Sequence, residues 1–443
     1  MHVLFHRGKG PKNAYLLTAE SAVARVSLKC VQSSTWVCHL TNNWRRVDTK
    51  HCLPFDAWSP PAGSQRISIH NPRLAARNHL AGGLLQESMG MGTIMEFEFT
   101  AVRPQESPND VDEVRKLLAA SQLEFDSPVQ VLVLCRVRGR MVACAGLDHN
   151  VIKCVAVAQD FRGESLSLRL GSEIVALAAQ RREFHLFLYS PPHNRELFRG
   201  WGFYPLVEVP DLVILMENSP IAIQRYCDSL RLRRKPGDRI GCCVLNANPF
   251  TLGHRYLVER AASECDWLHV FVVKEDASTF SYDDRFALVA AGVKNISNLT
   301  LHQGSDYIIS RATFPGYFLK DKLVIDHSWA GIDLLLFREH IAPSLGITDR
   351  YVGTEPLDTV TSNYNVDMRY WLHDATSCAP AVTVVELPRA SIDGIPISAS
   401  TVRRLLAEGD FIAIQKLVPT STLKFLQIKD AATPLAAGGA NRT

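Results

Sequence analysis

One short polar segment, residues 246–254 (NANPFTLGH), limits the fold of this chain more than any other. It follows the apolar run 240–245 (IGCCVL), which predicts a buried strand, and it leads into 254–264, where apolar residues recur with helical spacing. A buried strand that turns directly into a helix is the start of a βα unit. Repeated units of this kind build a parallel sheet through right-handed crossovers, so the sequence predicts an α/β domain here.

The same alternation continues toward the C-terminus. Further strands are predicted at 267–273, 299–304, 349–356 and 381–389, and further helices at 283–293 and from residue 398 onward. Because ligands of parallel α/β sheets bind at the carboxyl ends of the strands, we expect the functional residues in the turns that follow these strands.

The segment 246–254 has the properties of a phosphate site. The first turn of a helix carries backbone N–H groups without partners and the positive end of the helix dipole, and both attract anions. Gly253 permits close approach, and the imidazole of His254 can stabilise charge that develops on a phosphate. A histidine at a helix start is also a common capping or surface residue, so this stretch alone leaves both interpretations open.

A second helix start offers a matching site. Residues 397–401 (ISAST) place small hydroxyl side chains directly before the helix that contains Arg403. Other groups suited to anions follow the predicted strands between the two sites, and each also has an ordinary alternative as a solvated residue: Lys274, Arg285, and Glu355 in the segment VGTEP. Because all of these groups fall at strand ends of one sheet, they favour a functional role for His254.

Residues 95–225 predict a separate α+β domain with a hairpin, a strand ending in QDFRGES (159–165), a helix, a further strand and a short helix ending in GWGFYP. This order resembles the acyl-CoA N-acetyltransferase (GNAT) fold, in which a glycine-rich turn binds pyrophosphate at a helix N-terminus. The turn here has Gly163, but Glu164 and Ser165 follow where that family has a second small residue. Acyl-CoA chemistry and a structural or carrier-docking role therefore both stay open.

The remaining segments predict little regular structure. Residues 1–94 carry 11 Lys and Arg against 4 Asp and Glu and show no sustained periodicity. They predict a basic extension that is poorly ordered, or a translated leader upstream of a natural start at Met95, with a basic arm for nucleic acid or membrane as the alternative. Residues 226–239 predict a charged linker, 240–430 the second domain, and 431–443 a flexible tail.

Composition narrows the class of protein. The chain of 443 residues has no apolar run that approaches the roughly 20 residues needed to span a bilayer and no signal peptide, so we expect a cytoplasmic protein. Its 11 cysteines are scattered through apolar runs without metal-ligand spacing, which predicts core residues and no metal site. With 48 basic and 45 acidic residues and no basic stripe with interleaved aromatics, neither nucleic acid nor a membrane is expected as a partner.

Two motifs together resemble a known superfamily. Asn248–His254 and Ile397–Arg403 are similar to the paired HxGH and ISSTxxR signatures of the nucleotidyltransferases, with Thr251 in place of the first histidine. That departure fits one branch. With the stretches 304–320 and 340–365 and the acetyltransferase-like domain in front, residues 95–430 resemble the citrate lyase ligase family.

The resemblance implies an ATP-dependent acid–thiol ligase. Acetate would attack the α-phosphate of ATP, giving acetyl-adenylate and pyrophosphate, and the acetyl group would pass to a thiol on the acyl carrier subunit of citrate lyase. That thiol belongs to a phosphoribosyl-dephospho-CoA prosthetic group. Mg²⁺ is expected with the ATP phosphates.

The resemblance also implies roles for residues. His254 and Thr251 would hold the α- and β-phosphates, and Lys274, Arg285 and Arg403 would neutralise pyrophosphate. Hydrogen bonds would come from Ser398 and Ser400. The other predicted nucleotide-binding residues shape the turn or border the adenosine pocket: Asn246, Asn248, Pro249, Phe250, Gly253, Gly353 and Glu355.

Three other functions remain as alternatives. A nucleotidyltransferase acting on a phosphorylated cofactor precursor would share the fold and both phosphate motifs, but would not need the first domain. An N-acetyltransferase using acetyl-CoA would use the second domain only for regulation. A non-catalytic assembly factor would merely dock the carrier subunit.

Overall fold

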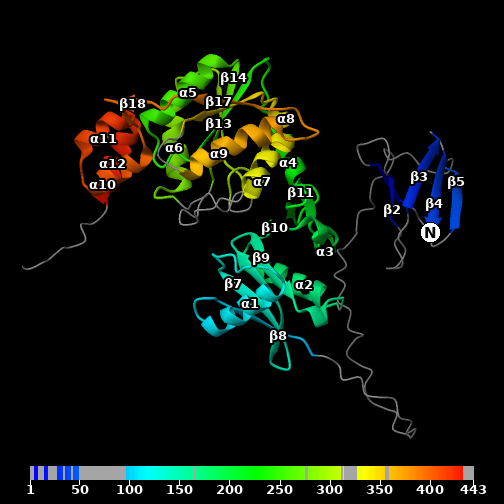
Figure 1. Ribbon diagram of the computed structural model, residues 1–443. Coiled ribbons are helices and arrows are strands. Elements are labelled where there is room, and N and C mark those ends of the chain that lie inside the picture. Colours follow the sequence, from blue (N-terminus) through cyan, green and yellow to red (C-terminus); the bar gives the residue numbers. More distant parts are fainter. Residues whose placement is uncertain are drawn as a thin grey trace, which may run out of the picture. The chain divides into compact units, whose positions relative to one another are not determined.

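The computed structural model describes residues 96–163, 165–274, 278–310, 313, 327–354 and 359–432, together with five strands before residue 49 (Figure 1). Within the described ranges, residues 327–329, 359–363, 395 and 432 are described by backbone alone. The chain divides into two compact units, Met1–Met91 and Gly92–Thr443, and each is described here by itself.

The first unit contains only antiparallel pairings in its described strands. β1 (Leu4–Arg7) pairs with β2 (Ala14–Leu17), and β3 (Ser27–Gln32), β4 (Thr35–Leu40) and β5 (Asn43–Asp48) form a three-stranded sheet. The sequence predicts no regular structure in this basic extension, so these strands are an addition. The hypothesis of a leader ahead of Met95 falls outside the described residues.

The second unit begins with the acetyltransferase-like domain, a seven-stranded sheet with the order β11-β12-β10-β9-β8-β7-β6. Its strands are β6 (Glu98–Val102), β7 (Val131–Val137), β8 (Arg140–Asp148), β9 (Val151–Val157), β10 (Phe187–Ser190), β11 (Tyr204–Val209) and β12 (Val213–Glu217). Only β9 and β10 run parallel, because a helical crossover joins them.

Helices cover both faces of this sheet. The helical segments are α1 (Pro108–Ala120), η3 (Gln159–Phe161), α2 (Leu166–Gln180), η4 (Pro192–Asn194) and α3 (Arg195–Gly200). Alternate residues of β7 point to opposite faces: Leu132 packs with Val114 of α1, while Val133 packs with Leu170 of α2. The domain is α+β, as the sequence predicts.

The C-terminal domain is built on a five-stranded, fully parallel sheet with the order β15-β14-β13-β16-β17. The strands are β13 (Ile240–Leu245), β14 (Trp267–Val272), β15 (Leu299–His302), β16 (Asp349–Gly353) and β17 (Thr383–Leu387). Successive strands extend the sheet one way from β13 to β15, and then the other way from β16 to β17. The change of direction falls between the neighbouring strands β13 and β16.

Both faces of this parallel sheet are buried by helices, which explains the nearly continuous apolar strands. On one face Cys243 and Leu245 of β13 pack with α5 (Leu252–Glu264) and α6 (Tyr282–Val293). On the other face Cys242 packs with the helical segments α7 (His327–Leu336), η6 (Phe337–Ile341), α8 (Ala342–Leu345), α9 (Thr359–Arg369) and η7 (Tyr370–Asp374). The predicted α/β fold is confirmed.

The C-terminal segment adds a small hairpin and three helices. β18 (Ser391–Ile392) pairs with β19 (Ile395–Pro396), and the helices are α10 (Ala399–Ala407), α11 (Phe411–Leu417) and α12 (Thr420–Ala432). These helices lie together at the red end of the chain in Figure 1, with their own apolar core and with α12 against α6. They hold the N-terminus of α10 beside the sheet.

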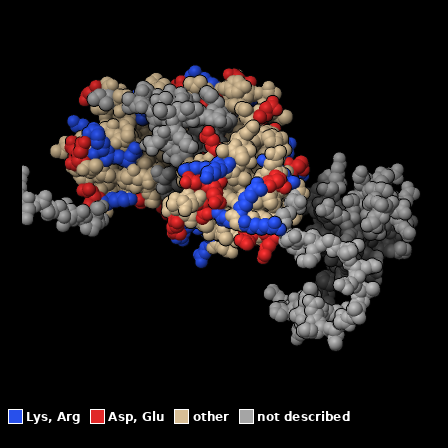
Figure 2. All heavy atoms as spheres, turned by 60° about the horizontal axis from the view of Figure 1, so that its bottom comes forward, with Lys and Arg blue, Asp and Glu red and all other residues tan. Residues whose placement is uncertain are grey.

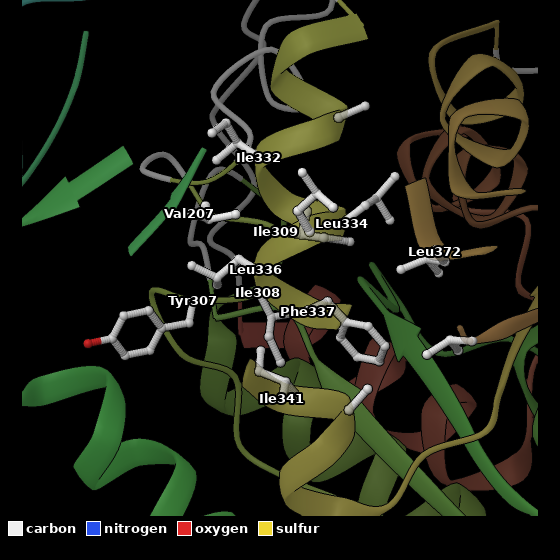
Figure 3. Packing of buried hydrophobic residues seen from close by; sticks show 14 of the residues in the cluster. Val207, Tyr307, Ile308, Ile309, Ile332, Leu334, Leu336, Phe337, Ile341 and Leu372 are labelled. Carbon is white, nitrogen blue, oxygen red and sulfur yellow. The ribbon is translucent and has the colours of Figure 1, made fainter. Parts of the chain in front are cut away.

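One apolar cluster continues from the first sheet into the second domain. Figure 3 shows Val207 of β11 close to Ile308 and Leu336, which belong to the same cluster of buried residues. The helix α4 (Ala222–Arg231) buries Cys227 and Leu230, so it occupies the beginning of the segment that the sequence predicts as a linker. The connection between the two domains is thus partly helical and packed.

Surface charge is mixed. Figure 2 shows Lys and Arg interspersed with Asp and Glu over the face in view. Within the part of the chain that the structure describes, no helix is long and apolar enough to cross a membrane.

Candidate functional site

A cavity of about 230 Å³ opens at the carboxyl ends of β13 and β16. It is lined by Leu245 and Asn246 at the end of β13, by Val352 and Gly353 at the end of β16, and by the first turn of α5. This is the point at which the strand order changes direction, where open parallel sheets bind their ligands. The sequence-predicted turn 246–254 therefore borders a cavity at the expected edge of the sheet.

A reciprocal cap fixes the start of α5. The Thr251 hydroxyl accepts a hydrogen bond from the His254 backbone N–H at 3.4 Å, and the Thr251 backbone N–H donates to Nδ1 of His254 at 3.1 Å. Thr251 is 1% exposed, and its Oγ1 lies 2.9 Å from His254 Nδ1. Thr251 thus orients the His254 ring. This geometry gives Thr251 a capping role in addition to the phosphate contact that the sequence predicts.

The cap also determines which tautomer His254 adopts. Because Nδ1 accepts the N–H of Thr251, the neutral ring carries its proton on Nε2. Burial, with a smaller contribution from the Arg389 charge, lowers the pKa of His254 to about 4. The ring stacks on Phe250, with centroids 5.8 Å apart. At neutral pH the cavity is therefore lined by an uncharged imidazole that serves as a hydrogen-bond donor.

The two sequence signatures meet in space. Arg403 of α10 donates from Nη1 to the backbone oxygen of Asn248 at 2.5 Å, across 155 residues of sequence. A β-carbon added at Gly253 would lie 3.3 Å from the carbonyl oxygen of Ile397, so the two turns approach closely. Ile397 and Ala399 line the cavity together with His254. The N-termini of α5 and α10 thus border one cavity.

Hydroxyl groups cap the start of α10. Ser398 accepts a hydrogen bond from the Thr401 backbone N–H at 3.0 Å, and its hydroxyl lies 2.8 Å from the Ser400 hydroxyl. Ser398 is 5% exposed, whereas Ser400 is exposed. Ser400 is thus the more accessible of the two predicted hydrogen-bond donors.

Arg285 lies in the core behind the turn. It is fully buried, and Nη1 donates to the backbone oxygens of Asn246 at 2.9 Å and Val273 at 2.8 Å, while Nε donates to that of Phe280 at 3.2 Å. These bonds tie together the carboxyl ends of β13 and β14. The predicted contact with pyrophosphate finds no support in this geometry, because the guanidinium is engaged by backbone carbonyls.

Lys274 and the two asparagines connect the turn to its neighbours. Lys274 is exposed and lies 3.3 Å from Asp306. The side-chain oxygen of Asn248 accepts from the Phe280 backbone N–H at 3.2 Å, and that of Asn246 accepts from Ser278 at 3.2 Å. Only Asn246 of this group lines the cavity, so the predicted orienting role suits both asparagines better than direct contact with a nucleotide.

Phe250 and Pro249 are buried. The two residues predicted to border the adenosine pocket, Gly353 and Glu355, differ in whether the structure describes them. A β-carbon at Gly292 of α6 would lie 2.2 Å from the Phe250 ring, which places that ring in the core. The structure therefore supports packing of the turn, not of a nucleotide base. Gly353 lines the cavity with open space in front of it. Glu355 lies outside the described residues.

Sequence reasoning missed several cavity residues. Arg350 of β16, Arg389 after β17, and Tyr364 and Asn365 of α9 line the cavity. Asn365 donates to the backbone oxygen of Gly353 at 3.0 Å. A charged residue inside the apolar strand DRYVG was the available signal for Arg350, because an arginine in a buried strand needs a partner.

The acetyltransferase-like turn has a different character. Gly163 adopts φ +88°, but Ser165 makes no side-chain capping bond to α2, and Asp160 pairs with Arg140 at 2.7 Å on the surface. Trp201, in the GWGFYP stretch, packs edge-on against Phe198 with centroids 5.1 Å apart, which is a core contact.

The described cysteines are unpaired, and most of them are buried. Burial raises the pKa of Cys144 and of Cys242 to about 12 and that of Cys265 to about 11. Thiols with raised pKa are poor nucleophiles. Among the residues described here, no group of three or more His, Cys, Asp or Glu side chains could hold a metal ion.

Fold and site together define a nucleotidyltransferase-like α/β domain that follows an acetyltransferase-like domain. A family model described as "Citrate lyase ligase C-terminal domain" matches residues 240–426. The [Citrate [pro-3S]-lyase] ligase of Escherichia coli is 49% identical over 329 residues, which cover 74% of this chain and 93% of that protein. The chain therefore belongs to the citrate lyase ligase family, and the resemblance found in the sequence is confirmed.

Two solved structures show more distant likenesses. An acyl-CoA N-acyltransferase from Pseudomonas aeruginosa covers 28% of this chain and 100% of its own, with 17% identity and a TM-score of 0.24. A nicotinate-nucleotide adenylyltransferase from Vibrio parahaemolyticus, described as putative, covers 43% of this chain and 98% of its own, with 17% identity and a TM-score of 0.27.

Proposed function

We propose that this chain adenylates acetate with ATP and transfers the acetyl group to the prosthetic-group thiol of the citrate lyase acyl carrier subunit, which activates citrate lyase. Membership of the citrate lyase ligase family supports the proposal at the level of a ligase. The observation that carries the chemistry is the pair of helix N-termini at one cavity, with neutral His254 in the first turn of α5.

In the first step a carboxylate oxygen of acetate attacks the α-phosphorus of ATP. An acyl–phosphate bond forms, the bond between the α-phosphorus and the bridging oxygen breaks, and pyrophosphate leaves. The backbone N–H groups of α5 and Nε2–H of His254 donate to phosphate oxygens, on which negative charge develops. Because His254 is neutral, its contribution is a directed hydrogen bond that costs no desolvation of a cation.

The ends of the two helices hold the rest of the triphosphate. Ser400 and the first turn of α10 donate to pyrophosphate oxygens, and Arg403 holds the two turns together through Asn248. Lys274 approaches the pyrophosphate from the exposed end of β14. Mg²⁺ bound together with ATP would supply counter-charge to the phosphates.

In the second step the thiolate of the carrier's prosthetic group attacks the acetyl carbonyl carbon. A carbon–sulfur bond forms, the bond to the AMP oxygen breaks, and AMP leaves with the electron pair. No protein nucleophile takes part, which agrees with the raised thiol pKa values of the buried cysteines.

Acetate-dependent exchange of labelled pyrophosphate into ATP tests the proposal, because only reversible formation of acetyl-adenylate gives it. We expect exchange with acetate alone and without the carrier subunit. A nucleotidyltransferase would need a phosphorylated precursor in place of acetate, an N-acetyltransferase would consume acetyl-CoA, and an assembly factor would do neither. Correctly folded protein that shows no pyrophosphate exchange with acetate, propionate or malonate would contradict the proposal.

A further inference from the structure

Three arginines are buried in the described part of the chain, and one of them differs from the others. Arg285 and Arg338 are satisfied by backbone carbonyls; Arg338 donates to the oxygens of Ala375 at 2.8 Å and Trp371 at 3.0 Å. Arg350 is 2% exposed, and its Nε and Nη1 atoms have no hydrogen-bond partner. Arg350 is the buried arginine that lines the cavity.

The position of Arg350 makes it the inner wall of that cavity. It pairs with Cys242 of β13 across the switch point, so it lies deeper in the sheet than Asn246 and the start of α5. Its guanidinium lies over the Phe337 ring, 4.5 Å from the centroid. The cavity is thus lined both by helix N-termini and by a buried arginine with two unpaired donor atoms.

Nothing among the described residues neutralises this cation directly. Asp333 acts on Arg350 through space, and both of its carboxylate oxygens accept hydrogen bonds from other groups. One accepts from the Ile309 backbone N–H and the Thr313 hydroxyl, each at 2.7 Å, and the other accepts from the Tyr364 hydroxyl at 2.6 Å. Arginine does not lose its proton in proteins, and a buried charge is costly unless it is paired. The empty hydrogen-bonding positions therefore call for an anion.

The surroundings favour a small carboxylate over a phosphate. Ile309, Val352 and Met368 line the cavity as well, and they give an apolar surface that suits a methyl group. The planar fork of a guanidinium matches the two oxygens of a carboxylate. The helix N-termini, which suit phosphates, belong to other parts of the cavity lining, the turns at the starts of α5 and α10.

We propose that Arg350 is the receptor for the carboxylate substrate, holding its two oxygens while the apolar wall receives its alkyl group. In the reaction proposed above that substrate is acetate, so this inference deepens the proposed function and rests on it. An oxygen held in this way keeps a free lone pair toward the α-phosphate.

The test compares Arg350→Gln and Arg350→Lys with Arg338→Gln, a matched removal of an equally buried arginine. We expect Arg350→Gln to raise the acetate KM in pyrophosphate exchange by about 100-fold, while the Kd for ATP, measured by calorimetry, changes by less than about threefold. Arg350→Lys keeps the positive charge but lacks the planar guanidinium fork. Its acetate KM should therefore lie between those of the wild type and Arg350→Gln. Arg338→Gln lowers the unfolding temperature but leaves the acetate KM unchanged.

A chemical rescue experiment distinguishes a role of Arg350 in folding from a role in binding the substrate. Guanidinium ion added to Arg350→Ala restores exchange at low acetate if the group acts on substrate, and does not restore it if the role is structural. If Arg350→Gln fails to fold, Arg350→Lys and this rescue decide the question. An unchanged acetate KM, or an ATP Kd that weakens as much as the acetate KM, overturns the proposal; the second result would make Arg350 a phosphate ligand.

Direct binding distinguishes failure of this inference from failure of the proposed function. Acetate and propionate should protect the wild-type protein against thermal unfolding without ATP, with chloride as the control, and should not protect Arg350→Gln. Protection without any acetate-dependent exchange would leave the carboxylate site in place and refute the ligase. Exchange in the wild type with identical acetate KM in Arg350→Gln would refute the site alone.

Discussion

The connection from β9 to α2 and the connection from β13 to α5 share one local plan, a strand followed by a polar turn and a helix N-terminus. They differ in what holds them. The first has no side-chain cap at Ser165 and an exposed ion pair at Asp160. The second is capped by Thr251 and tied to distant segments by Arg285 and Arg403.

This difference shows which features make a helix N-terminus an anion-binding site. Any helix start attracts anions weakly, because its N–H groups are unpaired. Only the β13–α5 turn also borders a cavity at the switch point of a parallel sheet and faces a second helix N-terminus. Rigid support and an adjoining cavity, rather than the strand–turn–helix motif itself, therefore distinguish the β13–α5 turn from the β9–α2 turn.

The largest effect is expected for His254→Ala. Loss of one preorganised donor to a transition-state oxygen costs roughly 100- to 1000-fold in rate, so acetate-dependent exchange should fall by about that factor. Arg162→Ala, in the β9–α2 turn, should leave exchange within about twofold. Circular dichroism and the unfolding temperature check that both variants fold. Near-normal exchange in folded His254→Ala would remove the histidine from the mechanism.

Arg285→Leu should affect stability more than any surface change. The substitution leaves the backbone oxygens of Asn246, Val273 and Phe280 without their donor, and buried unpaired acceptors cost about 1–3 kcal/mol each. We expect a loss of about 3 kcal/mol or more in the free energy of unfolding, measured with urea. Lys274→Ala, at an exposed strand end, should cost less than about 1 kcal/mol. Equal losses in the two variants would refute the clamp assigned to Arg285.

Much of this site could be predicted from the sequence because it depends on local chemistry. The motif 246–254 predicts the strand, the turn and the helix, and apolar spacing predicts the parallel sheet. The roles of Arg285 and Phe250 could not be predicted, because whether a side chain faces a ligand or the core depends on packing between α6 and β13. Arg350 was missed for a similar reason, since only the pairing of β13 with β16 brings it to the cavity.

Acid should destabilise the region around β13 and β14 more than the seven-stranded sheet of the acetyltransferase-like domain. Burial lowers the pKa of His254 and His269 to about 4 and that of His302 to about 3, below the value of about 6.5 expected in an unfolded chain. Between these values the unfolded chain binds more protons, so stability is full above about pH 6.5 and falls as the pH is lowered toward 4.

Each of these histidines contributes up to about 1.4 kcal/mol per pH unit in that window, less where solvent screens the ring. Hydrogen exchange read by mass spectrometry at pH 7 and pH 5, corrected for intrinsic rates, should show greater loss of protection in β13, β14 and β15 than in β7 and β8. His302→Gln should reduce that loss. Equal loss in the two regions would contradict the assigned ring environments.

The smallest effect gives the sharpest comparison of the two turns, because it changes only their caps. Thr251→Val removes a capping hydroxyl that accepts the His254 N–H, and should cost about 1 kcal/mol in the free energy of unfolding. Ser165→Ala removes a hydroxyl that makes no capping bond, and should cost close to nothing. Thr251→Ser, which keeps the hydroxyl, serves as the control. Because Thr251 also orients His254, Thr251→Val should lower exchange several-fold, whereas a cap that acts only on stability would leave exchange unchanged in the folded variant.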